Sequence, residues 1–272
     1  MKTYTEIIIE HINREKSELL IALLDELGFN GFEETDNSLK AFINTELYDE
    51  NELRKLAAEA QFDFRLENIE EQNWNALWES NFAPVVVDDF VAVRAIFHKQ
   101  KFDVEHEILI TPKMSFGTGH HATTFMMIQQ MRHLNFGLKN VLDFGTGTGV
   151  LAILAEMLGA SEIIALDNDD WSIENALENV EANHCRKIKI EKAHTALTED
   201  KYAIILANIN KNVIIANAET LVNQLCKNGI LLLSGLLLED ENDIIQTFSM
   251  SGLRHKNTEK RAQWISMIWE LE

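Results

Sequence analysis

The hydrophobic positions of the first 67 residues change repeatedly between strand spacing and helix spacing. Three consecutive isoleucines predict a strand near the start, and leucines recurring every three or four residues predict a helix that ends at Gly28. The predicted elements are, in order, a strand over 4–11, a helix over 15–27, strands over 31–35 and 39–47, a helix over 51–60 and a strand from Phe62 to Leu66. This β-α-β-β-α-β order is typical of a small α+β domain of the ferredoxin-like type.

From about residue 120 onward, short apolar runs alternate with segments of helical spacing. The clearest helix covers 173–180 and is expected to bury Ala176 and Leu177 on one face. Strands are expected over 141–144, 163–167, 187–190, 204–208 and 230–234, after a β-rich stretch containing 85–87, 91–96 and 108–110, and two final runs over 254–259 and 262–270. The alternation predicts an α/β fold, with a parallel sheet between two layers of helices and a closing hairpin.

An acidic segment, residues 68–82, separates these two patterns and carries Trp74 and Trp78. The two tryptophans are four residues apart, so they share one face of a helix, and packing against a domain is the interpretation we favour. A chain of 272 residues is long for a single core. We therefore expect a first domain over 1–67, a linker helix over 68–82 and a second domain over 83–272.

The composition is that of an ordinary soluble protein, with 46% hydrophobic and 25% charged residues. No apolar run approaches the roughly 20 residues that span a bilayer, and the start lacks the pattern of a secretory signal. Two cysteines, Cys185 and Cys226, without ligand-like spacing fit a reducing cytoplasm. The net charge of −20 argues against binding a nucleic-acid backbone. It would attract basic partners, although solubility alone also explains an acidic surface.

A glycine-rich turn follows the predicted strand over 141–144. Gly145, Gly147 and Gly149 let the backbone approach a ligand closely, and Asp167 lies 22 residues after Gly145 at the end of the next strand. Dinucleotide binders need G-x-G-x-x-G so that a helix N-terminus faces a pyrophosphate. Here Val150 stands where the third glycine would fall. The tighter turn favours S-adenosylmethionine, which has no phosphate.

Two further features lie close to sheet ends or helix starts. Phe116 and Gly117 precede a helix that begins near Thr124, so this loop either covers a ligand or is a glycine hinge with a threonine as helix cap. Asn208 ends the predicted strand over 204–208, where ligands of open α/β sheets bind. Its amide offers a donor and an acceptor, but capping the helix that begins near Asn210 is an equally open interpretation.

Three strings of residues together resemble one protein family. FGTGHHATT at 116–124, VLDFGTGTGVLAILAEMLGA at 141–160 and ANI at 207–209 are similar to the bacterial ribosomal protein L11 methyltransferase family, PrmA type. The resemblance covers nearly the whole chain. It implies a Rossmann-like class I methyltransferase domain, with a seven-stranded, mostly parallel sheet and a C-terminal antiparallel hairpin, behind a ferredoxin-like N-terminal domain. The chain departs from the family's usual residues at Thr111, Ala122, Thr146 and Thr148.

The resemblance implies donor contacts at Thr124, Gly145, Asp167 and Asn208. We add Phe116, Gly117 and Gly147 as contacts of S-adenosylmethionine, and we assign Asn208 to orienting the acceptor amine. The implied activity is methylation of lysine side chains and of the N-terminal amino group of L11. Two alternatives stay open, a class I methyltransferase with another acceptor and a non-catalytic module that binds S-adenosylmethionine.

Other prominent side chains receive structural interpretations. His120 and His121 are adjacent and do not face one site, so we expect no metal. Trp264 and Trp269 are expected to pack the terminal hairpin rather than bind substrate.

The implied partner is L11, a basic protein met before it assembles into the ribosome. The first domain is the natural recognition module, because acidic residues gather on it: Glu10, Glu15, Glu18, Asp25 and Glu26. A solvated face is the competing explanation for those residues. We expect a cytoplasmic monomer with no direct contact to nucleic acid or membrane.

Overall fold

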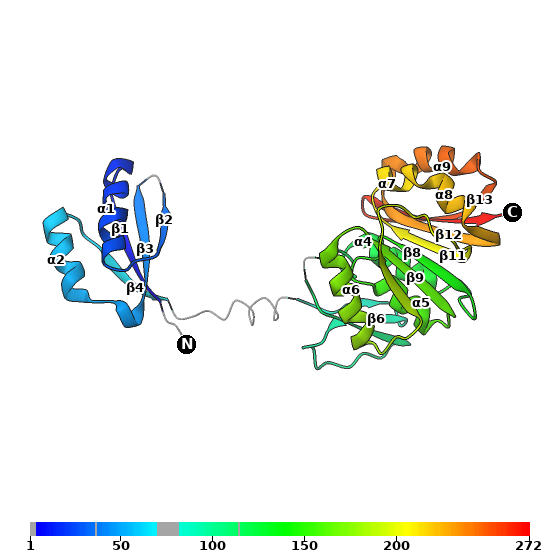
Figure 1. Cartoon of the computed structure of the whole chain (residues 1–272), viewed down its shortest axis with the longest axis horizontal. Coiled ribbons are helices and arrows are strands. Elements are labelled where there is room, and N and C mark those ends of the chain that lie inside the picture. The colour runs from blue at the N-terminus through cyan, green and yellow to red at the C-terminus, as the bar shows by residue number, and fades with distance from the viewer. Residues whose placement is uncertain (1–3, 36, 70–81, 114) are drawn as a thin grey trace. The chain divides into compact units, whose positions relative to one another are not determined.

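The computed structural model describes residues 4–35, 37–69, 82–113 and 115–272. These residues belong to two compact units, Met1–Asn81 and Phe82–Glu272, whose helices and strands are labelled in Figure 1. The first unit has one hydrophobic core and the second unit has two. The linker helix expected over 68–82 falls largely on residues 70–81, which lie outside the described residues.

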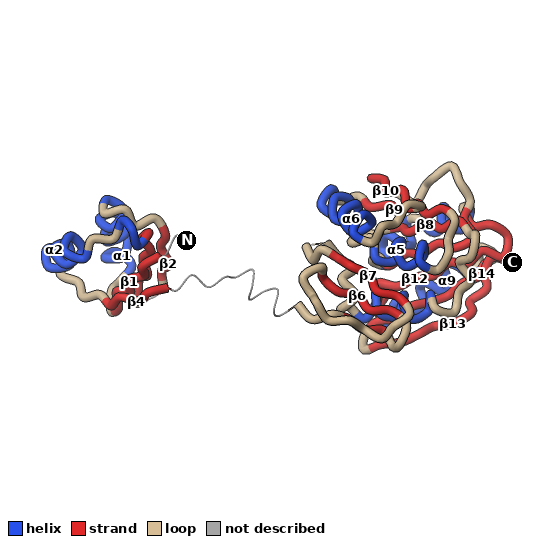
Figure 2. Tube along the Cα trace, turned by 90° about the horizontal axis from the view of Figure 1, so that it is seen from below, coloured by secondary structure: helices blue, strands red, loops and turns tan. Residues whose placement is uncertain are grey.

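The first unit has the β-α-β-β-α-β order that the hydrophobic pattern predicts. Its elements are β1 (Tyr4–Glu10), α1 (Arg14–Glu26), β2 (Gly31–Glu34), β3 (Ser38–Asn44), α2 (Glu50–Ala60) and β4 (Arg65–Ile69). The four strands form an antiparallel sheet in the order β2-β3-β1-β4. Both helices cover one face of this sheet, as Figure 2 shows. The core between the helices and the sheet includes Ile7, Ile9, Leu20 and Leu53.

The third and fourth strands of this unit differ most from the prediction. The strand expected to reach residue 47 ends at Asn44, because Thr45–Leu47 form a 3-10 turn (η1) whose Glu46 amide donates to the Asn44 side chain at 3.1 Å. The strand expected from Phe62 begins at Arg65 instead. The Phe62 amide donates back to the Ala57 carbonyl at 3.0 Å, so this residue still belongs to the end of α2.

The second unit is built on the seven-stranded sheet that the fold class requires. Its strand order is β10-β9-β8-β11-β12-β14-β13; the first five strands are parallel, and β14 and β13 form the predicted antiparallel hairpin. From residue 122 onward, the elements of this unit are α4 (Ala122–Met131), β8 (Asn140–Phe144), α5 (Val150–Met157), β9 (Glu162–Asp167), α6 (Asp170–Ala182), β10 (Ile188–Lys192), β11 (Tyr202–Asn208), α7 (Lys211–Ala216), α8 (Ala218–Asn223), β12 (Leu225–Leu237), η2 (Leu238–Asp240), α9 (Glu241–Ser249), β13 (Leu253–Arg261) and β14 (Trp264–Leu271).

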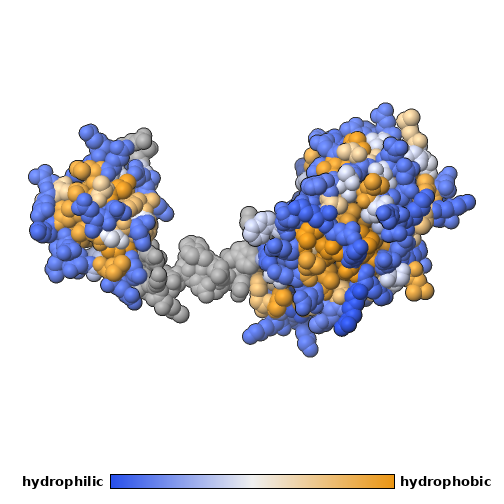
Figure 3. Space-filling model, in the orientation of Figure 1, coloured by the Kyte–Doolittle hydropathy of each residue, from blue (hydrophilic) through white to orange (hydrophobic). Residues whose placement is uncertain are grey.

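A smaller sheet precedes the large one along the chain. It contains β5 (Val85–Val87), β6 (Val91–Ala95) and β7 (His106–Ile110), in that order, so β7 is an edge strand. Its apolar side chains join those of α4 and α5 in one core. On the drawn face of the second unit, apolar side chains gather in one patch with polar ones around it (Figure 3).

Helices cover both faces of the large sheet, and alternate residues of its strands feed two cores. In β8, Val141 packs with α4 and α5, whereas Leu142 and Phe144 pack with α7, α8 and α9. Figure 1 shows these two groups of helices on either side of the sheet. No helix in the described part of the chain is both long enough and apolar enough to cross a membrane.

The buried face of α6 differs from the one expected. Ala176 is buried as predicted, but Leu177 is 52% exposed. The buried positions around Ala176 are Ser172, Asn175 and Asn179. This face packs against the backbone of neighbouring segments, whose polar groups need hydrogen bonds, so asparagine serves there better than leucine.

Candidate functional site

The glycine-rich turn after β8 lies directly against the chain at Phe116. Gly147 has a φ of +55°, and a Cβ at this position would lie 2.2 Å from the Phe116 carbonyl oxygen. The next amide, Thr148, donates to that same oxygen at 2.9 Å. Glycine at 147 is therefore required by both its backbone conformation and its contact.

The amides of this turn already donate inside the protein. Gly145 and Thr146 both donate to the Leu166 carbonyl, at 2.8 and 2.9 Å, and Gly149 donates to Thr146 at 2.9 Å. Gly147 donates to the Asp167 carboxylate at 2.9 Å. A phosphate-binding turn directs free amides at its ligand. The satisfied amides of residues 145–149 are suited to a ligand without a phosphate.

Asp167 ends β9 beside the turn. One carboxylate oxygen accepts from Gly147, and the other accepts from the Asp169 amide at 3.1 Å. These bonds fix the carboxylate at the carboxyl edge of the sheet while each oxygen keeps further acceptor capacity. The half-buried side chain can therefore accept hydrogen bonds from ligand hydroxyl groups.

Asn208 ends β11 and is buried. Its Nδ2 donates to the Thr124 hydroxyl at 3.1 Å. Its Oδ1 has no hydrogen-bond partner among the described residues. The cap of α7 is Asn210, whose side chain accepts from the Val213 amide at 3.2 Å, so the helix-cap interpretation applies to Asn210 and not to Asn208. A buried amide oxygen without a partner is costly, and it is suited to meeting a donor group of a ligand.

These features meet in one cavity of about 350 Å³ at the carboxyl ends of the parallel strands. The lining residues are Phe116, His121, Thr123, Gly145, Gly147, Asp167, Ser172, Asn208, Ile209, Asn210, Gly235 and Trp264. Five of the seven predicted donor-binding residues belong to this lining. Thr124 and Gly117 do not, because Thr124 is fully buried behind Asn208 and Gly117 is bound to the Thr148 hydroxyl at 2.8 Å.

Trp264 lines the cavity, which corrects the expectation that it packs the hairpin as Trp269 does. Trp269 is fully buried in the core, whereas the Trp264 ring lies 4.5 Å from the His121 ring, centroid to centroid. His121 in turn lies 5.2 Å from the Phe116 ring. The three rings form an aromatic wall, defined here as Phe116, His121 and Trp264.

His121 has a second role that the sequence pattern did not reveal. Its side chain caps α4 by accepting from the Thr123 amide at 3.4 Å, and its Nδ1 also pairs with the Thr123 hydroxyl at 2.7 Å. The N-cap of α4 is therefore His121 and neither Thr123 nor Thr124. Its neighbour His120 pairs instead with Thr118 and with the Ala83 carbonyl, at 3.0 and 2.8 Å. Within the described ranges, no three His, Cys, Asp or Glu side chains form a group suited to a metal ion.

Asp143 is a buried acid beneath the glycine turn. Burial raises the pKa of its carboxyl to about 7, the hydrogen bond from the Thr146 hydroxyl at 2.6 Å opposes this rise, and the negative charge of Asp167 adds to it. Asp143 does not line the cavity, so its contact with Thr146 shapes the turn from below.

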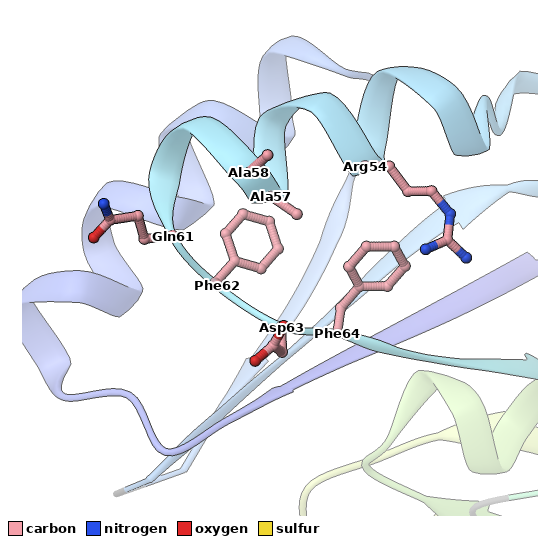
Figure 4. Close-up of a pocket in the computed structure, with 7 residues that line it drawn as sticks. All are labelled: Arg54, Ala57, Ala58, Gln61, Phe62, Asp63 and Phe64. Carbon is pink, nitrogen blue, oxygen red and sulfur yellow. The ribbon is translucent and has the colours of Figure 1, made fainter.

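A larger cavity of about 550 Å³ lies in the first unit and contains none of the predicted residues. Figure 4 shows it between α2 and the chain leading into β4. Its charged side chains are Arg54 and Asp63, and the Arg54 guanidinium lies 5.8 Å from the Phe64 ring centre. Arg54 is also paired with Glu50 at 2.6 Å, so no reactive cluster forms there.

Comparisons with known proteins agree with the geometry of the second unit. A family model described as "Ribosomal protein L11 methyltransferase (PrmA)" matches residues 3–272. Two proteins named ribosomal protein L11 methyltransferase illustrate the similarity in sequence. The one from Phocaeicola vulgatus is 33% identical over 263 residues, covering 94% of both chains. The one from Chlorobaculum tepidum is 36% identical over 285 aligned positions, covering 99% of this chain and 98% of that one.

A solved structure supports the fold. The crystal structure of ribosomal protein L11 methylase from Lactobacillus delbrueckii subsp. bulgaricus matches with a TM-score of 0.66 and 24% identity, covering 70% of this chain and all of that one. The match over residues 3–272 decides the family, because it includes both units and every residue of the cavity. This chain belongs to the ribosomal protein L11 methyltransferase family.

Proposed function

We propose that the protein uses S-adenosylmethionine to methylate lysine side chains and the N-terminal amino group of ribosomal protein L11. The observation that carries this proposal is the buried, unpartnered Oδ1 of Asn208 in a cavity that also contains the glycine turn and Asp167. An amine is a hydrogen-bond donor of the kind that such an oxygen needs.

The residues present fit this methyl donor. The cavity of about 350 Å³ is within the range of small-molecule sites. Asp167 supplies acceptors for ribose hydroxyls, and Gly147 lets the ligand approach the backbone closely. The amides of residues 145–149 are already used within the protein, in agreement with a donor that carries no phosphate.

The chemistry then depends on alignment of the acceptor amine. The donor, when bound, supplies a methyl group on a positively charged sulfur. A lysine amine with a pKa of about 10.4 is almost wholly protonated at neutral pH, and it must lose a proton to the solvent before it enters the cavity and attacks. Asn208 Oδ1 accepts a hydrogen bond from the neutral amine and so points the nitrogen lone pair at the methyl group. The Thr124 hydroxyl holds the other end of the amide at 3.1 Å and fixes its direction.

The aromatic wall of Phe116, His121 and Trp264 serves the charged product. Positive charge develops on the nitrogen during transfer, and ring faces attract a methylated ammonium. The rings also keep water away from the attacking nitrogen.

The first unit recognises the protein substrate in this proposal. The acidic residues Glu10, Glu15, Glu18, Asp25 and Glu26 are all exposed. A net charge of −20 supports a basic protein partner and disfavours nucleic acid as an acceptor. The proposal places the reaction in the cytoplasm, on L11 before its assembly into the ribosome, and with a monomeric enzyme.

The test is incubation of the full chain with labelled S-adenosylmethionine and free L11, followed by mass spectrometry of the labelled protein. Label on lysine and N-terminal nitrogens of L11 is expected. Asn208→Ala should lower kcat by about 100-fold, because it removes the group that aligns the amine, and should weaken donor binding less than Asp167→Ala does. Asp167→Ala should instead weaken donor binding. Asn135→Ala, on an exposed asparagine of the same unit, is the matched control and should change neither.

Two results would overturn the proposal. Label on another acceptor would keep the methyltransferase and exclude L11 as its substrate. Donor binding without any transfer to L11 or to whole-cell extract would favour a non-catalytic module.

A further inference from the structure

Three asparagines form a row on α6 and at its end. Asn175, Asn179 and Asn183 are spaced four residues apart, so they share one face of the helix. Asn175 and Asn179 are fully buried. Polar side chains are buried only where hydrogen bonds repay their loss of water. The partners of this row are all backbone groups.

The row completes the free edge of the smaller sheet. Asn183 accepts from the Leu109 amide at 2.8 Å and donates to the Leu109 carbonyl at 2.7 Å, as a neighbouring strand would. Two residues further along, Thr111 donates to Asn179 at 2.7 Å and accepts from Asn175 at 2.9 Å. The asparagines therefore extend the pairing of β7 beyond its last strand residue.

Asn179 differs from the other two because it also reaches the glycine turn. Its Nδ2 donates to the Thr148 carbonyl at 2.8 Å. Thr148 in turn donates from its amide to Phe116 at 2.9 Å and from its hydroxyl to Gly117 at 2.8 Å. One buried amide thus joins Thr111 to the turn on which Phe116 and Gly117 rest.

We infer that Asn179 is a positioning residue for the methyl-donor cavity, a role that rests on the proposed function. It does not line the cavity. It sets the distance between the glycine turn and the Phe116–Gly117 backbone, and this distance determines the width of the cavity where Gly147 meets Phe116. Asn183 makes the same kind of bond to Leu109, two residues before Thr111, and also donates to the Asn179 carbonyl at 2.7 Å, but it contacts neither wall of the cavity.

The test compares donor binding by variants of the full chain, measured calorimetrically with S-adenosylmethionine. Asn179→Ala is expected to raise the donor Kd by about tenfold or more, because it leaves the buried Thr148 carbonyl without its hydrogen-bond donor and so releases the turn that lines the cavity. Asn183→Ala removes a comparable set of hydrogen bonds from the same helix face and should lower the melting temperature similarly. Its donor Kd should stay within about twofold of the parent.

Thr148→Val supplies a second, milder variant if Asn179→Ala does not fold. Valine keeps the shape of threonine and deletes the hydroxyl that holds Gly117. This variant should also raise the donor Kd. In the double variant the two effects should be less than additive, because both changes release the same contact between turn and wall.

The outcomes separate the inference from the function on which it rests. Equal donor Kd values for the parent and Asn179→Ala, or an equal rise for Asn183→Ala and Asn179→Ala, would overturn the positioning role alone. Failure of the parent chain to bind the donor would overturn the proposed function and the inference with it. A rise in the donor Kd for Asn179→Ala and Thr148→Val, but not for Asn183→Ala, would support the positioning role of Asn179.

Discussion

Gly147 must be glycine for two reasons, its positive φ and its close contact with Phe116. Gly252 has a positive φ without such a contact, so a comparison of the two glycines separates the two effects. Gly252 also has a positive φ, +77°, but a Cβ there would meet only Leu271 at 3.9 Å. Gly252→Ala should therefore cost about 1–2 kcal/mol, the price of a left-handed conformation. Gly147→Ala should be destabilised by the same conformational effect and also by a collision with the Phe116 carbonyl, because its Cβ would lie 2.2 Å from that oxygen.

The expected difference appears in donor affinity as well as in stability. In urea unfolding, the free energy of unfolding should be lower for Gly147→Ala than for Gly252→Ala. Calorimetry should show a donor Kd raised by about tenfold or more for Gly147→Ala alone. Equal affinity in the two variants would mean that the turn does not meet the donor.

Asp143 makes the stability of the second unit depend on pH. Burial raises the pKa of its carboxyl to about 7, whereas an aspartate in the unfolded chain ionises near 3.9. Between about pH 4 and pH 7 the folded state retains a proton that the unfolded chain has lost, so the free energy of unfolding falls as pH rises through this window. Asp143→Asn removes this titration and keeps an acceptor for the Thr146 hydroxyl.

Urea unfolding at about pH 5 and about pH 8 tests this expectation. From the lower to the higher pH, the parent should lose stability relative to Asp143→Asn by up to a few kcal/mol. Parallel pH profiles for the two proteins would show that Asp143 does not titrate in this window.

The β13–β14 hairpin carries two tryptophans with different tasks, although both sit on one strand. Trp269 is fully buried with its ring 5.7 Å from Phe248, so Trp269→Ala should destabilise the protein by about 3–5 kcal/mol. Trp264 is partly exposed at the cavity. Trp264→Ala should change stability by less than about 1 kcal/mol and lower kcat/KM for L11 about tenfold.

Trp264→Phe keeps an aromatic face at the wall and serves as the control. It should recover most of the activity that Trp264→Ala loses. If Trp264→Ala unfolds the chain as readily as Trp269→Ala, the hairpin uses both rings as core, as the sequence alone suggested.

Local patterns predicted the elements whose residues interact with near neighbours in the chain. Gly145, Gly147 and Asp167 belong to a strand-turn-helix signal, and Asn208 marks the end of an apolar strand, so their shared edge of the sheet could be predicted. Of the aromatic wall, Phe116 was predicted as a donor contact, whereas His121 and Trp264 could not be predicted in this way. Trp264 reaches the cavity because β14 runs antiparallel beside β12, and nothing near it in the sequence indicates this neighbour.

The same limit explains the prediction for α6. Apolar spacing suggested that Leu177 faces the core, because asparagines are usually solvated. Asn175 and Asn179 are buried instead, since the face meets backbone groups of Thr111 and Thr148 that need hydrogen-bond partners. A helix that packs on backbone reverses the usual polarity rule, and only the tertiary contact reveals it.

In the proposed function, the acidic surface of the first unit recognises L11 and the second unit carries out methyl transfer. The contribution of the first unit can be tested on the intact chain. Glu15, Asp25 and Glu26 are exposed on α1. Reversing all three to lysine should raise KM for L11 and weaken its dependence on ionic strength, because steering of a basic protein by surface charge is a screened, long-range effect. The donor KM should not change, since the donor cavity lies entirely within the second unit.

A control with the same net charge separates steering by α1 from a general charge effect. Glu162, Glu199 and Asp200 are exposed acids of the second unit, and reversing them to lysine changes the total charge by the same amount. If recognition resides in the first unit, only the α1 variant raises KM for L11, by about threefold to tenfold at low salt. An equal rise in both variants would mean that L11 senses the overall charge of −20 rather than a surface of the first unit. In that case the acids of α1 would not identify the first unit as the recognition module.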